Sequence, residues 1–164
     1  MQKLLKTGQV RNIGVSNFDQ ENLEKLLAAE STTVVPAVNQ IELHPNHPSP
    51  KLIAFNQSKG IHSTAYSCLG STDSPLYKDQ TLLELAKAKG KTPQQVMLMW
   101  GLQRETSVIP KSVTKSRIEA NFQLDGWELT QEEMNKVSNL KDRFKVCGDA
   151  WLPEGVKVFF GNDE

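Results

Sequence analysis

The chain has 164 residues, and its 19 Lys and Arg residues balance 19 Asp and Glu residues. A formal net charge of zero gives no global attraction to nucleic acid or to an anionic membrane surface. Its apolar runs are far shorter than the ~20 residues of a membrane-spanning helix, and the first residues lack the apolar core of a signal peptide. We therefore expect a single-domain cytoplasmic protein covering residues 1–164. Cys68 and Cys147 fit a reducing compartment but leave a disulfide open.

Short β-rich runs alternate with helical patterns along the chain. The first residues are typical of the end of a helix, and strands are predicted near residues 10–16, 35–41, 61–67 and 107–110. Such alternation is typical of parallel strands that are linked by crossover helices. The predicted fold class is therefore α/β.

Local signals predict where the intervening helices begin. Asp19 can cap one helix, and Pro50 suits the first position of the next. Thr92 and Thr130 each begin a capping-box sequence, the second with an apolar pair placed as a hydrophobic staple. The helix after Thr92 is predicted to present Val96, Met99 and Trp100 on one face.

Glycines and a long loop separate these elements. Gly60 and Gly90 follow Lys-rich helix ends, where a left-handed residue is expected. Residues 68–80 form a polar loop that is long enough to be functional and that follows the C-terminal end of a predicted strand.

Two cations lie where the last predicted strand passes into a helix start. Lys111 and Arg117 flank the hydroxyl groups of Ser112 and Thr114. A helix N-terminus offers unpaired N–H groups and partial positive charge, so this arrangement is typical of a phosphate site. Taken alone, it would equally suit a solvated connection between a strand and a helix.

Three upstream segments join this one in a family resemblance. The segments are residues 11–18, 38–45 and 64–71, and their order and spacing resemble the C-terminal half of an aldo-keto reductase. The resemblance implies a partial TIM (β/α)8 barrel with about four C-terminal βα units, followed by a C-terminal helix and tail. The length agrees, since a whole barrel needs about 250 residues.

The resemblance also implies a site for a nicotinamide cofactor. Ser16, Asn17 and Gln40 would hydrogen-bond the nicotinamide carboxamide, which needs both donors and acceptors. Tyr66 would stack on the nicotinamide ring. The alternative for Ser16 and Asn17 is a polar turn before a helix. The alternative for Tyr66 is a core position in which only the hydroxyl group contacts water.

The rest of the cofactor is assigned in the same way. Ser67, Leu69 and Ser71 would touch the pyrophosphate, although Cys68 replaces the proline that is usual in the family. The residues that match the family's site for the adenosine 2′-phosphate and the adenine are Lys111, Ser112, Thr114, Arg117 and Asn121. This match favours NADP(H) over NAD(H). Ala120 replaces an acidic residue of the family, which puts the adenine contact in doubt.

The family reduces aldehydes and ketones to alcohols by hydride transfer, and the tail resembles fungal members. Its catalytic Asp, Tyr, Lys and His come from the first four βα units and have no counterpart here, so no catalytic residue is assigned. We expect a truncated chain that is inactive alone and that acts on a small aldehyde or ketone only if the missing half is supplied.

Three alternatives remain at this point. The chain could be a non-catalytic nucleotide-binding or interaction protein, because half a barrel leaves strand edges that favour self-association. It could contain a rebuilt site that uses Tyr66, His44 or Lys111. A metal site at His44 and His47 is disfavoured, because no third ligand accompanies them.

Asp142, Asp149 and Glu154 are expected in solvent. Trp151, Phe159 and Phe160 are expected either in a substrate loop or over the barrel surface.

Overall fold

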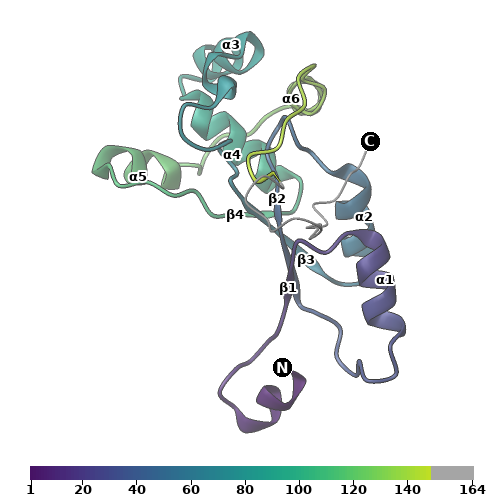
Figure 1. Cartoon of the computed structure of the whole chain (residues 1–164). Coiled ribbons are helices and arrows are strands. Elements are labelled where there is room, and N and C mark those ends of the chain that lie inside the picture. The colour runs from purple at the N-terminus through teal and green to yellow at the C-terminus, as the bar shows by residue number, and fades with distance from the viewer. Residues whose placement is uncertain (149–164) are drawn as a thin grey trace. The chain divides into compact units, whose positions relative to one another are not determined.

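The structure is a computed structural model that describes residues 1–148. Within this range the chain divides into two compact units. The first unit comprises Met1–Ile41 and Ser49–Thr64, and the second comprises Glu42–Pro48 and Ala65–Gly148. Figure 1 labels the elements of both, and each unit is described by itself.

Four strands form one sheet in the order β1-β2-β3-β4. They are β1 (Val15–Ser16), β2 (Val38–Glu42), β3 (His62–Tyr66) and β4 (Ser107–Val108). β1 pairs with β2 in parallel, with Ser16 opposite Gln40. All four predicted strands exist and the α/β class is confirmed, but β1 and β4 are two residues long rather than seven and four. These two are the edge strands, so each has a partner on one side only.

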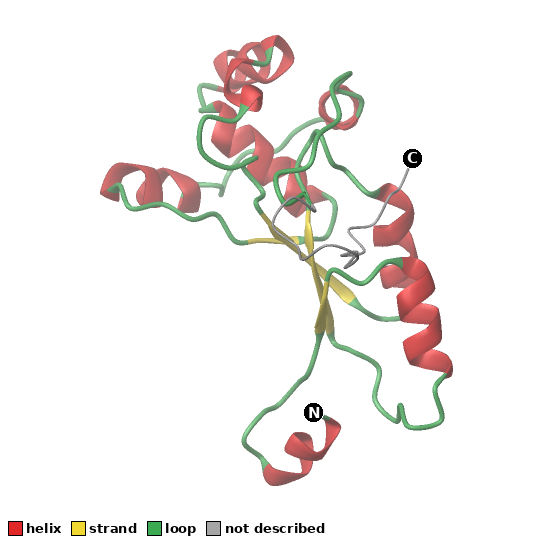
Figure 2. Cartoon of the chain, in the orientation of Figure 1, coloured by secondary structure: helices red, strands yellow, loops and turns green. Residues whose placement is uncertain are grey.

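The first unit holds a short 3-10 helix, η1 (Gln2–Thr7), and the helices α1 (Gln20–Ala28) and α2 (Pro50–Ser58). α1 and α2 lie on the same side of the strands (Figures 1 and 2). The Asp19 side chain accepts the N–H of Asn22 at 2.7 Å, which confirms the predicted cap. Pro50 occupies the first turn of α2 as predicted, while Ser49 before it is left-handed and makes no side-chain cap.

The second unit holds a 3-10 helix, η2, and four α-helices, of which α5 stands apart from α3 and α6 in Figure 1. The elements are η2 (Pro75–Lys78), α3 (Gln80–Lys89), α4 (Pro93–Gln103), α5 (Lys115–Phe122) and α6 (Gln131–Ser138). Gly90 ends α3 in the left-handed conformation, at φ 64°, as predicted. η2 lies within the segment that was predicted as a loop.

α4 is buried on every side rather than on the single predicted face. Seven consecutive residues, 95–101, are buried. The reason is that η2, α3, α5, α6 and β4 all pack against this helix. Its residues therefore form the centre of a hydrophobic core, which includes Val96, Met97, Met99, Trp100, Leu76, Leu82, Leu129 and Val137.

Both predicted capping boxes are present. The Thr92 hydroxyl accepts the N–H of Gln95 at 3.2 Å, and the Thr130 hydroxyl accepts that of Glu133 at 3.3 Å. In each case the third helical side chain bonds back to the N–H of the cap residue. Leu129 and Met134, the staple pair before and within α6, are both buried in the core.

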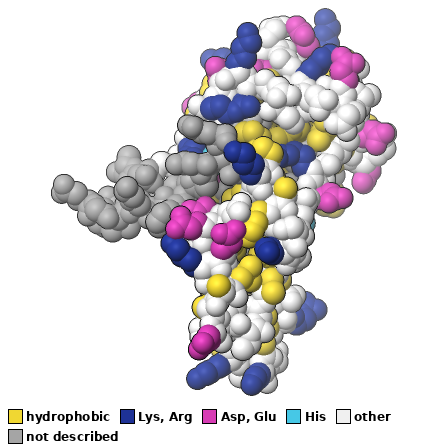
Figure 3. Space-filling view, turned by 90° about the vertical axis from the view of Figure 1, so that its right-hand side faces the viewer, with side chains coloured by type: hydrophobic (Ala, Val, Ile, Leu, Met, Phe, Trp, Pro, Cys, Tyr) yellow, Lys and Arg dark blue, Asp and Glu magenta, His cyan; other side chains and the backbone are white. Residues whose placement is uncertain are grey.

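Several large apolar side chains reach the surface, and Figure 3 shows hydrophobic atoms exposed among charged groups on one face. In the second unit, Phe122 is 86% exposed and Val113 is 83% exposed. Within residues 1–148, no helix is long and apolar enough to cross a membrane. Asp149, Trp151, Glu154, Phe159 and Phe160 lie outside the described residues.

Candidate functional site

In the first unit, the ends of β1 and β2 bring three predicted residues together. The carbonyl oxygen of Gln40 accepts the Ser16 hydroxyl and the Asn17 N–H, each at 2.9 Å. The parallel register produces this arrangement, since Ser16 lies opposite Gln40. Asn17 is left-handed, with φ 59°, and its buried Oδ1 has no donor among the described residues.

Asn39 holds this turn in place, a role that sequence reasoning missed. Its side chain is fully buried, donates to the carbonyl oxygen of Phe18 at 2.8 Å and accepts the N–H of Phe18 at 3.4 Å. The pair of bonds fixes the chain just beyond Asn17. A buried amide in a predicted strand is the signal that could have revealed it, because buried polar groups require partners.

In the second unit, the loop after β3 is tightly folded. Ser67 and Ser71 are left-handed, at φ 49° and 71°. Gly70 between them has φ 70°, and a Cβ there would lie 2.3 Å from Ser74 Oγ, so only glycine fits. The loop is closed by two bonds, one from the Gly70 N–H to the Ser67 carbonyl and one from the Tyr77 hydroxyl to the Ser71 carbonyl, at 2.7 and 2.8 Å.

Three side chains of this region differ in exposure. Tyr66 is half-buried at the end of β3. The Leu69 side chain packs against the core, which leaves its backbone for the predicted pyrophosphate contact. Cys68 is buried, and burial raises the pKa of its thiol to about 11. Cys68 and Cys147 are both free, so the disulfide left open by the sequence does not form.

The predicted phosphate residues surround the start of α5. Ser112 Oγ accepts the Thr114 N–H at 3.2 Å, and the Thr114 carbonyl accepts the N–H groups of Arg117 and Ile118, each at 3.0 Å. Lys111, Thr114 and Arg117 are exposed, and no carboxylate in the described part of the chain pairs with either cation. The helix start therefore offers uncompensated positive charge.

Within the second unit, the charge of Arg117 in α5 acts on Tyr77, the residue whose hydroxyl closes the loop after β3. Burial raises the pKa of Tyr77, while the charge of Arg117 acts on the hydroxyl in the opposite direction. Arg117 is thus close enough to Tyr77 for its charge to be felt. Asn121 lies further along α5 and is half-buried.

Gln95 attaches α5 to α4, a second role that the sequence did not reveal. Its Nε2 donates to the carbonyl oxygens of Ala120 and Gln123, at 3.0 and 3.2 Å. Its Oε1 accepts the Thr92 N–H at 3.0 Å. One buried amide therefore caps α4 and holds the far end of the helix that presents Arg117.

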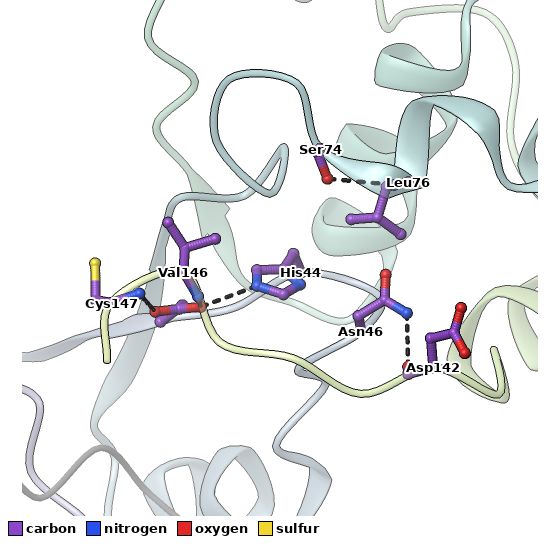
Figure 4. Close-up of polar contacts among 8 residues, drawn as sticks. His44, Asn46, Ser74, Leu76, Asp142, Val146 and Cys147 are labelled. Atoms are coloured by element: carbon purple, nitrogen blue, oxygen red, sulfur yellow. Dashed lines mark hydrogen bonds and ion pairs between the residues drawn. The ribbon is translucent and has the colours of Figure 1, made fainter. Parts of the chain in front are cut away.

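His44 is enclosed in the core, and its Nδ1 has no hydrogen-bond partner among the described residues. Its side chain is fully buried, and Nε2 lies 3.0 Å from Glu42 Oε1. Within residues 1–148, no three His, Cys, Asp or Glu side chains gather as a metal site. A rebuilt active site that uses His44 is disfavoured by this burial. Figure 4 shows the pair and the backbone groups around it.

Comparisons with known proteins point to one family. The model of the aldo/keto reductase family matches residues 1–142. Glycerol 2-dehydrogenase (NADP(+)) of Saccharomyces cerevisiae is 42% identical over 156 residues, which cover 93% of this chain and 49% of that protein. The aldehyde reductase YPR1 of the same yeast is 44% identical over 140 residues, covering 85% and 44%.

Solved structures give the same result. The aldose reductase of Schistosoma japonicum matches with a TM-score of 0.83 and 40% identity, over 90% of this chain and 47% of that one. The aldose reductase of Giardia lamblia matches with a TM-score of 0.85 and 37% identity, over 92% and 52%. The chain thus spans about half the length of the relatives that it matches.

Proposed function

Because the chain belongs to the aldo/keto reductase family, we propose that it binds NADP(H) and forms the cofactor-binding half of a carbonyl reductase. The substrates of the complete protein would be small aldehydes or ketones, which are reduced to alcohols. The names of the yeast relatives support this class, since one is an aldehyde reductase and the other an NADP(+)-dependent dehydrogenase of glycerol.

The single observation that carries the proposal is the unpaired positive charge at the start of α5. Lys111 and Arg117 are exposed, and the Ser112 hydroxyl marks the turn between them. A 2′-phosphate offers two negative charges and several acceptor oxygens, and a guanidinium group can hold them in a forked arrangement. NADP(H) has this phosphate and NAD(H) lacks it, so the site favours NADP(H).

The other end of the cofactor also finds suitable groups. Asn17 has a buried Oδ1 with no donor in the described residues, and the side chain of Gln40 lies at the adjacent strand end. A carboxamide supplies the N–H donor that Asn17 Oδ1 lacks. Bound NADPH would supply the hydride, whereas the residues of this chain bind and orient the nucleotide.

Carbonyl reduction also needs a proton donor, and we assign that role to no residue of this chain. Tyr66 is proposed to stack on the nicotinamide, and His44 is buried against Glu42. We therefore propose binding without turnover for the 164 residues alone, and turnover only when the remainder of the barrel is supplied.

Fluorescence titration of the chain with NADPH and NADH tests this proposal, run beside an NADPH-oxidation assay with a panel of aldehydes. We expect saturable NADPH binding that is tighter than NADH binding, and oxidation at the background rate. Failure to bind either nucleotide would contradict the cofactor assignment. Aldehyde-dependent oxidation well above background would contradict the inactivity.

A further inference from the structure

Glu42, at the end of β2, is bonded to a segment more than 100 residues further along the chain. Its Oε1 accepts the N–H of Val146 at 2.5 Å, and its Oε2 accepts the N–H of Cys147 at 2.8 Å. His44 lies two residues further along the chain, and its Nε2 is 3.0 Å from the same Oε1 (Figure 4). Both carboxylate oxygens therefore have partners, and all of these residues belong to the second unit.

Two further contacts hold the same segment, residues 142–147, which we call the strap. Asn46 Nδ2 donates to the carbonyl oxygen of Asp142 at 2.6 Å, and the Phe144 N–H donates to the carbonyl of Asn46 at 3.3 Å. The Phe144 ring lies 4.9 Å from the His44 ring, centroid to centroid. The strap is thus attached to residues 42–46 at successive points.

Glu42 is buried, so its carboxylate needs the hydrogen-bond donors that the strap supplies. Only 2% of Glu42 is exposed. A buried carboxylate is unfavourable unless hydrogen-bond donors replace the lost water, and two backbone N–H groups and an imidazole do so here. Burial, the largest single influence, raises the pKa of Glu42, but these donors together outweigh it and lower the pKa. The charged form is therefore the one that the strap favours.

We propose that the Glu42 carboxylate is a clamp that fixes the strap, through its Val146 and Cys147 amides, on the end of β2. The geometry carries this inference, because one side chain fills the hydrogen-bonding capacity of two consecutive backbone amides. The clamp is distinct from nucleotide binding and goes beyond it, since none of its contacts involves a residue assigned to the cofactor.

Glu42→Gln is the sharpest test, because the shape of the side chain stays and the charge goes. The glutamine Nε2 is itself a donor, so one of the two strap amides loses its acceptor. Glu128→Gln is the matched control, since Glu128 is exposed in the same unit and makes no contact with the strap. The readout is hydrogen–deuterium exchange of the full 164-residue chain, resolved to single amides.

We expect the Val146 and Cys147 amides to be protected in the unmodified chain. In Glu42→Gln at least one of the two should exchange about ten- to hundredfold faster, the factor for losing one charge-assisted hydrogen bond, while the amides of α4 keep their rates. Glu128→Gln should change neither set. Unprotected Val146 and Cys147 amides in the unmodified chain, or unchanged rates in Glu42→Gln, would overturn the clamp.

A pH series on the unmodified chain covers the case in which Glu42→Gln does not fold. The charged or titratable groups around the carboxyl are His44, two residues beyond the end of β2, and Asp142, Arg143, Lys145 and Cys147 on the strap. Of these side chains, His44 acts directly on the carboxyl. Because the Glu42 pKa is lowered, protection corrected for intrinsic exchange should persist through about pH 4.3, the usual glutamate value, and be lost below it.

The amides of α4 report global unfolding in the same experiment. Loss of strap protection at a higher pH than loss of α4 protection supports a local clamp. Simultaneous loss of both, or strap protection that persists down to the pH of global unfolding, would overturn it.

Discussion

At the scale of single residues, Arg117 is the side chain on which cofactor choice depends most directly. It is exposed at the start of α5 and has no carboxylate partner among residues 1–148. We predict that Arg117→Ala weakens NADPH binding about tenfold or more, the scale of one charge-assisted hydrogen bond, and leaves NADH binding nearly unchanged. Titration with both nucleotides measures the two effects.

Lys115 provides the control for this prediction. It belongs to the same helical turn, is 91% exposed and lies 3.9 Å from Glu119. Lys115→Ala removes one positive charge without removing the forked guanidinium group. An equal loss of NADPH affinity in both variants would show that the helix start attracts the nucleotide by net charge alone.

Cys68 gives a second prediction at this scale, from its raised pKa. Its thiol has a pKa of about 11 because it is buried, against an ordinary value of about 8.5. The thiolate is the reactive form, so Cys68 should stay unmodified by a maleimide at pH 8 until the protein unfolds. A Cys147→Ser variant leaves Cys68 as the single thiol, and mass spectrometry with and without denaturant measures its modification. Rapid labelling of this variant under native conditions would show that Cys68 is accessible.

The residues of the site differ in how far the sequence could predict them. The phosphate site at Arg117 was predicted from the local pattern of a helix start, whereas Ser16 and Asn17 were assigned through the family resemblance; the structure places the first at a helix start and the other two at the end of a strand. Glu42 and Gln95 were not predicted, because their partners lie about 104 and 25 residues away. Nothing in the local sequence indicates such pairing.

At the scale of elements, α5 depends on α4 for its position. Gln95 donates to two carbonyl groups at the end of α5 and also completes the capping box of α4. We predict that Gln95→Ala destabilises the fold by about 2 kcal/mol, since it removes the side-chain half of the α4 capping box and both hydrogen bonds to the end of α5. It should also weaken NADPH binding, because α5 presents Arg117. Denaturant unfolding and nucleotide titration measure the two effects.

Thr130→Ala separates these two consequences. It removes the capping box of α6 at a cost of about 1 kcal/mol, yet Thr130 has no bond to α5. NADPH affinity should therefore stay unchanged in this variant. If both variants lose stability and neither loses affinity, α5 does not need Gln95 to hold the nucleotide.

The boundaries of the helices were the most predictable feature of the elements. Asp19, Thr92 and Thr130 are local signals whose mechanism lies within four residues, and all three caps are present. The burial of α4 was predicted wrongly, because packing by five other elements is decided by residues far along the chain. The strands at the edges were predicted too long, since propensity does not report which strand lacks a second neighbour.

At the scale of the whole molecule, β1 and β4 are the edges of the sheet, each with a neighbouring strand on one side only. Apolar side chains are also exposed, among them Ile109 at 47% and Ile118 at 52%. Open strand edges and exposed apolar surface favour association. We predict that the purified chain forms dimers or higher oligomers, or binds hydrophobic dyes.

Sedimentation velocity, dye fluorescence and thermal unfolding on one sample test the association. Dilution should shift the oligomers toward monomer, because mass action governs assembly. A monodisperse monomer with one sharp unfolding transition and no dye binding would show that the chain covers its own strand edges and apolar surface. That outcome would leave the cofactor proposal intact, since none of the nucleotide contacts depends on a second copy.

The burial of α4 on all sides also determines which substitutions this helix can accept. A helix with one solvent face tolerates polar replacements at every third or fourth position, as α6 should, where Met134 and Val137 are its buried residues. Residues 95–101 offer no such position over almost two turns. In a saturation mutagenesis experiment scored by the amount of folded protein, α6 should give a periodic profile and α4 an uninterrupted stretch of intolerance.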